Sequence, residues 1–380
     1  MRKYDLSAAE WDDIAHCREA VATLQKLMST QLSWVLLLLP QSLKVAPTLQ
    51  AACDLLKRAI TADRAAAFRL LGHPPVAVWL GRTLRNPHWT VARYGDNIAA
   101  AAAILSGVEF TGQVLARKGK VVLPSLGVAD LGLTEEWSLV PIGHMSDKVI
   151  LSDLVLTDVG VDGPRWRASR RLSAGGVLLD DLEPYRGLPR EVLVRLSDED
   201  FARWRDMLAA AWELLRQNHP AMAAQLDLAL TLLVPALPGG GSTPYSGTPR
   251  DGFGCIGLAP RPTAAEVAET LVHEFAHSKF SAIIRISALF DPADETLFAS
   301  PWREDPRPLS GVLHGIYSFL QVAIFWHTQR EFGDEAAQFH LGTAREQLET
   351  AFTAIRNTSG LTEDGRKFVA GMADRLRSLR

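Results

Sequence analysis

Cysteine is scarce in this chain of 380 residues, which contains only Cys17, Cys53 and Cys255, far apart from one another. An odd number of widely spaced cysteines excludes a disulfide framework and a cysteine-rich zinc site. Basic side chains are not in excess either, because 40 Lys and Arg residues stand against 43 Asp and Glu residues and give a net charge of −3. This balance argues against nucleic acid as the main partner.

The chain also lacks an apolar run of the roughly 20 residues that a membrane-spanning helix needs. The strongly apolar stretch Trp34–Leu39 ends at Pro40, and residues 1–5 lead into acidic positions without the apolar core of a signal peptide. The composition, with 47% hydrophobic and 22% charged residues, is that of an ordinary globular protein. We therefore expect a soluble, cytoplasmic protein that does not act at a membrane.

Hydrophobic spacing predicts an α+β fold that is mostly helical, with a β-rich middle section and a short strand beside one central helix. We expect three parts: a helical N-terminal subdomain (1–106), a β-rich middle section (107–195) and a helical metal-binding catalytic region (196–380). The predicted helices cover about 7–30, 46–72, 97–105, 198–218, 221–233, 309–331, 334–356 and 362–378, and one more begins near 264 and continues through 284. The predicted strands cover about 108–115, 120–123, 136–140, 149–156, 176–179 and 253–259. Residues 235–252 are expected to form a loop, and 290–307 an irregular segment.

The third part contains the pattern H-E-x-x-H, formed by His273, Glu274 and His277. Two histidines four residues apart on an α-helix are separated by about 400° of rotation and about 6 Å of rise, so both rings point the same way. This spacing lets two imidazoles bind one transition-metal ion and leaves other coordination positions open for chemistry. The alternative is a surface helix that carries two histidines by chance.

The surrounding sequence favours the metal-binding interpretation. Residues 263–266 form a capping box, Thr-x-x-Glu, which predicts that a helix begins near Ala264. Apolar residues then recur at helical spacing through Phe275 and Ile283. The stretch 253–259 before the cap resembles a short strand, the arrangement found beside many metallopeptidase sites, and a substrate peptide could add to it as a further strand.

A mononuclear site needs a third protein ligand besides the two histidines. Metzincins place a histidine six residues after the second one, but Ile283 stands there. Gluzincins place a glutamate on a later helix, but the predicted helix 309–331 has no acidic residue in its interior. His314, near the start of that helix, is the best candidate. His327 is a weaker one, and His340 is expected at the surface.

Three histidines are compatible with zinc or with iron, and the residues alone leave both open. With zinc, Glu274 would be the general base that activates a metal-bound water for peptide hydrolysis. With iron, the open positions would bind a 2-oxo acid and dioxygen, and a cation would bind the far carboxylate of that acid. Arg303 and Arg307, which precede His314 in a proline-rich segment, are the candidates.

Four segments resemble one family, the H-E-x-x-H-containing proteins that modify peptides in bacterial ribosomal-peptide biosynthesis. The first segment, 121–127, resembles V-x-L-P-x-L-G, and the second, 179–186, resembles L-D-D-x-[DE]-P-Y-R. The third is the metal motif within 271–277. The fourth, 301–317, resembles P-W-R-x-D-P-R-P followed by G-x-L-[HQ]-G-x-Y, which ends at Tyr317. Together they span about residues 100–330 in the expected order.

The resemblance implies a 2-oxoglutarate- and Fe(II)-dependent enzyme that hydroxylates a β-carbon of a ribosomally made precursor peptide with dioxygen. It implies that His273 and His277 are iron ligands, with His314 as the expected third, and that Glu274 lies in the catalytic site. Arg303, Arg307 and Tyr317 would bind the co-substrate.

The acidic segment around Asp180, Asp181 and Tyr185 also matches that family. We interpret it as a structural turn, with peptide binding as the second interpretation. The alternatives for the whole protein are a zinc metallopeptidase and a non-catalytic scaffold that binds a precursor peptide. We also expect that the protein can form a homodimer.

Overall fold

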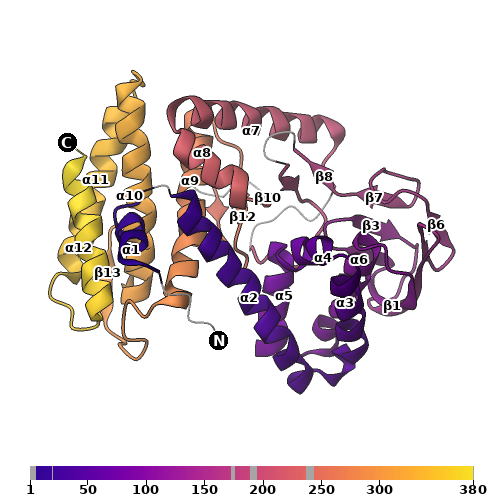
Figure 1. Ribbon diagram of the computed structural model, residues 1–380. Helices are drawn as coiled ribbons and strands as arrows, with labels where there is room; N and C mark the ends of the chain where they lie inside the picture. Colours follow the sequence, from indigo (N-terminus) through magenta and orange to yellow (C-terminus); the bar gives the residue numbers. More distant parts are fainter. Residues whose placement is uncertain (1–5, 19, 173–175, 189–194, 237–243, 380) are drawn as a thin grey trace.

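The computed structural model describes residues 6–18, 20–172, 176–188, 195–236 and 244–379 (Figure 1). Its described part has twelve α-helices, a seven-stranded sheet and a five-stranded sheet, which confirms the prediction of a mostly helical α+β fold. Figure 1 shows the curled seven-stranded sheet at one end and a bundle of C-terminal helices at the other. The long helix α2 (Val21–Val45) runs between these two ends.

The N-terminal helices are more numerous than the sequence predicts. The expected helix 7–30 is two helices, α1 (Ala8–Ala15) and α2, because the chain turns at Cys17, whose φ is 51°. The expected helix 46–72 divides at Asp63, whose side chain accepts a hydrogen bond from the backbone of Ala66 and caps the second half. The helices that follow α2 are α3 (Gln50–Ala62), α4 (Arg64–Leu71), α5 (Pro74–Arg85) and α6 (Trp89–Leu105).

Helix α5 is absent from the sequence prediction because Gly72-His73-Pro74 was interpreted as a helix break. The structure places Pro74 in the first turn of α5. The missing N–H of proline costs nothing at this position, so the same residues that end one helix also begin the next.

The seven-stranded sheet follows the predicted middle section. Its strands lie in the order β6-β5-β4-β1-β2-β3-β7. Their bounds are β1 (Phe110–Arg117), β2 (Lys120–Leu123), β3 (Gly127–Asp130), β4 (Ser138–Met145), β5 (Lys148–Leu151), β6 (Leu154–Leu156) and β7 (Trp166–Ala168). The predicted hairpin is confirmed, since Arg117 pairs with Lys120. Buried Asn97 on α6 joins helix to sheet, because its amide donates to the carbonyl oxygens of Leu115 and Val122.

Gly127 begins β3 where a side chain has no room. Its φ is +155°, and a Cβ atom there would lie 2.2 Å from the carbonyl oxygen of Arg167. We expect Gly127→Ala to lower the free energy of unfolding by about 1–3 kcal/mol, because backbone of the neighbouring strand would have to move. Urea unfolding measures this loss. Gly112→Ala is the control, since a Cβ at Gly112 would meet nothing within 4 Å, and an equal loss there would contradict the explanation.

The five-stranded sheet joins the middle section to the C-terminal region. Its order is β11-β12-β10-β9-β8. The bounds are β8 (Arg170–Arg171), β9 (Leu178–Leu179), β10 (Leu232–Pro235), β11 (Ser246–Gly247) and β12 (Cys255–Leu258). Strand β10 was missed, because the predicted helix 221–233 ends earlier, as α8 (Pro220–Ala229). Helix α8 follows α7 (Asp198–Asn218), whose N-cap is Ser197, as predicted.

The C-terminal region is built on α9 (Ala264–Ile286) and α10 (Leu309–Glu331), which pack together. Residues between them are not irregular as predicted, because β13 (Leu297–Ser300) and β14 (Arg303–Pro308) form an antiparallel hairpin. Helices α11 (Ala337–Ile355) and α12 (Glu363–Ser378) complete the bundle. Helix α10 is apolar and long enough to cross a membrane, but 72% of its most apolar window is buried inside the protein. It is a core helix, compatible with a soluble protein.

The hydrophobic core is divided differently from the predicted parts. One cluster contains most of the N-terminal helices and the seven-stranded sheet. A second contains the C-terminal helices together with α1 and the first half of α2, including Ile14 and Leu24. A small third cluster lies at the five-stranded sheet. In Figure 1, α1 accordingly lies beside α12 at the far end of the chain. The N-terminal helices therefore contribute to both clusters, and the division of the chain into three parts stays a prediction.

Candidate metal centre

Helix α9 begins where the sequence predicts and carries both histidines of the motif. Both bonds of the capping box are present: the backbone N–H of Glu266 donates to Thr263 Oγ1 (3.2 Å), and that of Thr263 donates to Glu266 Oε2 (3.0 Å). The cap fixes the rotation of the helix from its first turn. The neighbouring residues Phe275 and Ala276 are buried, whereas His273 and His277 stay partly exposed. The histidine face of α9 is therefore accessible to ligands.

The two imidazoles are close enough to share one ion. His273 Nε2 lies 3.2 Å from His277 Nε2. Two nitrogens that each bind one first-row metal ion at about 2.1 Å lie about 3.0–3.4 Å apart. The pair therefore fits a metal ion, which these nitrogens would hold from one side.

The electrostatic environment keeps both rings neutral. Burial, and then the positive charge of Arg261, lowers the pKa of His273 to about 4. Burial also holds the pKa of His277 well below its usual value, with further contributions from His273, His314 and Arg303. Neutral imidazole is the form that binds metal ions, so neither ring has to lose a proton near neutral pH.

His314 lies beside the pair, but against the other nitrogen of His277. The Nδ1 atoms of His277 and His314 are 3.4 Å apart. Within the described ranges, no three His, Cys, Asp or Glu side chains are arranged to hold one ion. A metal-bound histidine commonly uses its second ring nitrogen for a hydrogen bond that orients it, and His314 is placed to accept one. Its role as third ligand stays a prediction.

Glu274 lies on the opposite side of α9 from bulk solvent and is bonded to the edge of the five-stranded sheet. Thr248 Oγ1 donates to Glu274 Oε2 (2.9 Å) and to the backbone oxygen of Glu274 (2.8 Å). Burial raises the pKa of Glu274, while hydrogen bonds from Ser246 and Thr248 and the positive charges of Arg261 and Arg303 oppose the rise. Glu274 thus ties the metal helix to β11.

The hairpin β13–β14 separates the roles of the two candidate arginines. Arg307 forms an ion pair with Asp305 (3.3 Å). Arg303 is exposed and has no hydrogen bond or ion pair within the described residues. Its charge nevertheless acts on both His277 and Glu274, so its side chain lies within electrostatic range of the candidate metal centre. Arg303 is the better placed of the two to bind an anion there.

An aromatic wall fixes the hairpin beside the histidines. The ring of Trp302 stacks on Phe319 at 4.7 Å, and the edge of Phe319 meets His273 at 4.7 Å. Trp302 lies so close to α10 that a Cβ at Gly315 would be 2.4 Å from its ring. This contact explains a glycine one residue after His314. Sequence reasoning missed Phe319, because apolar residues occur all along α10 and local spacing does not single out one of them.

Arg261 is a second residue that sequence reasoning missed. Its side chain is half-buried, with Nε donating to Thr270 Oγ1 (3.2 Å) and Nη1 donating to the carbonyl of Pro244 (2.8 Å). Its charge acts on His273, Glu274 and Glu269, whose pKa burial raises to about 7. Two cations therefore act on the candidate metal centre: Arg261, from the loop before α9, and Arg303, from β14.

Tyr317, the third predicted co-substrate residue, lies in the core. It is 2% exposed, and its ring packs against Phe280 (5.5 Å) and Phe368 (6.0 Å). This packing accounts for an aromatic residue at this position, and contact with a co-substrate stays a prediction.

Strand β12 pairs with β10 along its length, and β11 pairs with it at Gly257 and Leu258. A substrate strand therefore has no free side of β12 at these two positions, and its addition along the rest of 253–259 stays a prediction. The outer strand of the sheet at the metal side is β11.

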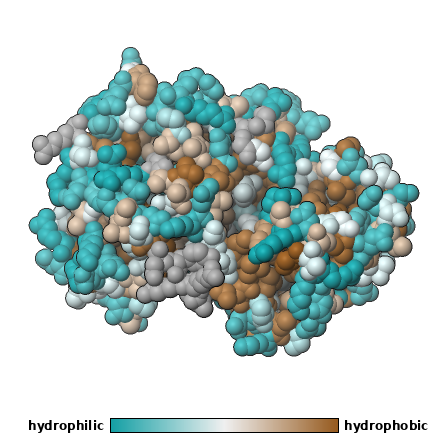
Figure 2. Space-filling model, viewed as in Figure 1, coloured by the Kyte–Doolittle hydropathy of each residue, from teal (hydrophilic) through white to brown (hydrophobic). Residues whose placement is uncertain are grey.

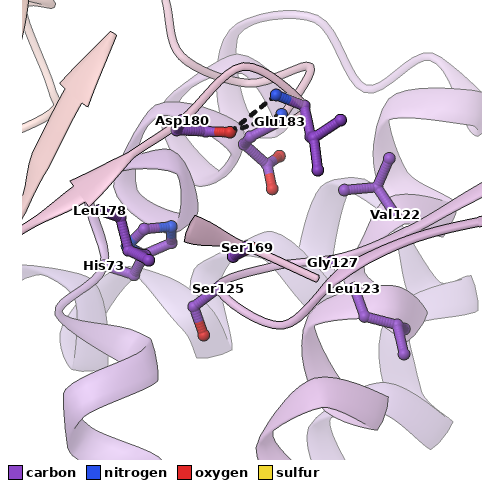
Figure 3. A pocket seen from close by; sticks show the side chains of 10 residues that line it. His73, Val122, Leu123, Ser125, Gly127, Ser169, Leu178, Asp180 and Glu183 are labelled. Carbon is purple, nitrogen blue, oxygen red and sulfur yellow. Dashed lines mark hydrogen bonds between the residues drawn. The ribbon is translucent and has the colours of Figure 1, made fainter. Parts of the chain in front are cut away.

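The acidic segment around Asp180 forms the predicted structural turn (Figure 3). Asp180 Oδ1 accepts hydrogen bonds from the backbone N–H groups of Leu182 (2.9 Å) and Glu183 (3.0 Å). Tyr94 donates to Glu183 Oε1 (2.5 Å), which ties the turn to α6. A cavity of about 10 Å³, close to the volume of one water molecule, separates this turn from the segment containing Ser125. Two of the four resembling segments therefore meet here.

Burial of Glu183 predicts a measurable pH dependence of stability. Burial raises its pKa from 4.5 to about 8, with the charge of Asp180 adding to the rise. The unfolded chain loses this proton first, so stability should fall between these two pKa values, by up to about 1.4 kcal/mol per pH unit. Urea unfolding at about pH 5.5 and 7.5 should show a smaller fall for Glu183→Gln than for the natural protein. Equal falls would contradict this assignment.

Comparison with known proteins gives no family for the chain. No protein-family model matches it, and a search of curated proteins finds no match. The function is therefore argued from the residues of the site.

Proposed function

We propose that the protein is a cytoplasmic Fe(II)- and 2-oxoglutarate-dependent hydroxylase that acts on a β-carbon of a ribosomally made precursor peptide. The observation that supports it best is Arg303, whose guanidinium has no partner within the described chain and whose charge acts on His277, one of a pair of neutral histidines. A hydrolase needs a metal and a base, but it has no need of a cation that can bind a dicarboxylate. The sequence resemblance points the same way.

The residues of the site have different roles. His273 and His277 hold the iron, and His314 either completes the ligand set or orients His277. Arg303 binds the far carboxylate of 2-oxoglutarate with a two-pronged, charge-assisted contact. When bound, iron and 2-oxoglutarate supply the oxidation of a C–H bond by dioxygen, with release of succinate and carbon dioxide.

The aromatic wall controls access to the site, and Glu274 controls the orientation of α9. Trp302 and Phe319 cover one side of His273 with apolar rings, which excludes water from that side. Thr248 holds Glu274 against β11, so the motif glutamate positions α9 relative to the sheet edge. The peptide carbon has to approach from the open histidine face.

The direct test uses protein loaded anaerobically with Fe(II). With 2-oxoglutarate, air and a precursor peptide encoded beside its gene, it should form succinate and a peptide heavier by one oxygen atom. Tandem mass spectrometry should place that oxygen on a β-carbon. Succinate formation without peptide oxidation, at the same rate with and without peptide, would contradict the proposed substrate.

A zinc peptidase is the second candidate, and one observation favours it. Burial raises the pKa of Glu274, which suits a general base near neutral pH. Zinc-loaded protein would then cleave the peptide, and Glu274→Gln would abolish cleavage. For the hydroxylase we expect Glu274→Gln to retain iron and much of the turnover, because glutamine can still accept the bond from Thr248.

A further inference from the structure

A large cavity lies apart from the metal centre, between α2, α4, α5 and the near ends of the strands. Its volume is about 830 Å³, within the range of about 300–1,000 Å³ that is typical of ligand sites. Figure 2 shows apolar side chains gathered on the surface near α2 and α5. The apolar lining comes mainly from α2, α4 and α5, with further residues from other helices and from the segments before β3 and β12. It includes Leu32, Val35, Phe68, Leu71, Leu126 and Phe253.

The cavity lies behind the metal helix. Phe253 lines it, and the Phe253 ring meets the edge of Phe275 at 6.1 Å. Phe275 lies two residues from both His273 and His277, a rotation of about 200°, so it points away from the histidine face. An occupant of the cavity would therefore contact Phe253, which packs on the back of α9, and would leave the histidine face free.

The uncompensated charge around the cavity is positive. Arg69 is exposed and has no hydrogen bond or ion pair in the described part of the chain, and Arg171 donates only to the carbonyl of Gly176 there. The one acidic lining residue, Asp251, is paired with Arg85 (2.9 Å) and Arg285 (3.1 Å). The cavity thus favours an occupant that carries negative charge.

A buried hydrogen-bond donor indicates that the occupant offers acceptors inside the cavity. Gln31 lines it and is 9% exposed; its Oε1 accepts a bond from Arg285, but its Nε2 has no partner among the described residues. Leaving a buried N–H unpaired costs about 1–3 kcal/mol. Ser125, Ser169 and Thr231 add further polar groups at separate places. Spaced polar groups suit a peptide backbone better than an alkyl chain.

One strand beside the cavity can pair with extended backbone. Strand β8 is the last strand of the five-stranded sheet, so one side of it has no strand partner within the described ranges. Ser169, which precedes β8, and Arg171 within it both line the cavity. The backbone N–H of Ser169 already donates to the carbonyl of Leu126, so pairing with a peptide would fall to Arg170 and Arg171, the two residues of β8. An outer strand of this kind can accept a peptide as a further strand.

We propose that this cavity binds a recognition segment of the precursor peptide, with apolar side chains inside and acidic residues at Arg69 and Arg171. This inference rests on the proposed function for its claim that the bound peptide is the substrate. The recognition segment is separate from the residue that is hydroxylated, because the cavity and the histidines lie on opposite faces of α9.

The test is direct binding to the full-length protein. The probes are fluorescein-labelled pentapeptide pools with Leu or Phe at three positions and Asp/Glu, Ser or Lys at the other two, measured by fluorescence anisotropy. The acidic pool should bind at least about tenfold more tightly than the lysine pool, and Arg69→Ala/Arg171→Ala should remove most of this difference. Arg356→Ala, which removes another exposed arginine, is the matched control and should change nothing.

Three results would overturn the proposal: no preference among the pools, no effect of the double variant, or binding of dodecanoate in place of the acidic peptides. The last result would assign the cavity to an anionic lipid. His273→Ala protein should bind the acidic pool as well as the natural protein does. In the natural protein, binding of the acidic pool without hydroxylation of any precursor peptide would contradict the proposed function alone. Hydroxylation of a precursor peptide without binding of the acidic pool would contradict this inference alone.

Discussion

Replacing His273 or His277 by alanine should abolish iron binding. Their Nε2 atoms are 3.2 Å apart and give the site its two best-placed nitrogens. Removal of either leaves a single imidazole of the motif. The affinity for iron should then fall by more than the roughly 10–100-fold that loss of an orienting partner costs. Metal analysis after anaerobic Fe(II) loading and desalting measures the effect. His327→Ala is the control, because His327 lies further along α10, and unchanged iron in His273→Ala would refute the site.

Variants of His314 distinguish its two roles. If His314 binds iron, His314→Ala and His314→Gln should both lose most of the metal. If it orients His277 through Nδ1, His314→Ala should weaken binding by about 10–100-fold. His314→Gln should then restore most of the affinity, since the amide oxygen can accept the same hydrogen bond.

The helices that carry the site could be predicted because their signals are local. The bounds of α10 match the predicted range, and α9 begins at the capping box that the sequence shows. Strands β10 and β14 could not be predicted in this way, because each is short and depends on a partner far along the chain or across a turn. The local pattern of apolar residues assigned β10 to the helix 221–233 and β14 to the irregular segment 290–307.

The same limit applies to the site. The two histidines of the motif share one helix, so their spacing predicted that they would lie together. The choice between Arg303 and Arg307 depended on Asp305, which pairs with one arginine and not the other, and no spacing rule contains that information. Arg261 contacts the site only because of how the loop before α9 folds onto Pro244.

The four resembling segments also divide between two places in the fold. The segments at 271–277 and 301–317 form the metal centre, whereas those at 121–127 and 179–186 meet around the small cavity beside Glu183. There, Asp180 closes a turn and Gly127 avoids a clash with backbone. Two of the four resembling segments are therefore explained by their structural roles in the fold, and the other two carry the candidate metal-binding residues.

Arg303→Ala should weaken the binding of 2-oxoglutarate far more than Arg307→Ala does. Loss of hydrogen bonds to a charged group costs about 1.5–3 kcal/mol, or about 10–150-fold in affinity. Arg307 already neutralises Asp305 and has less to offer a ligand, so its variant should stay within about threefold of the natural protein. Isothermal titration of the Fe(II)-loaded protein under anaerobic conditions measures both. Arg303→Lys should lie between them, because lysine keeps the charge and loses the fork.

The iron content of each variant separates this effect from damage to the metal centre. Arg303 lies within electrostatic reach of His277, but it donates no metal ligand, so Arg303→Ala should keep its iron. Removing a positive charge beside neutral imidazoles should, if anything, strengthen their hold on a cation. A variant with full iron and weak 2-oxoglutarate binding would identify Arg303 as the co-substrate residue. Full iron with unchanged 2-oxoglutarate binding would instead transfer that role to Arg261, the other cation whose charge acts on Glu274.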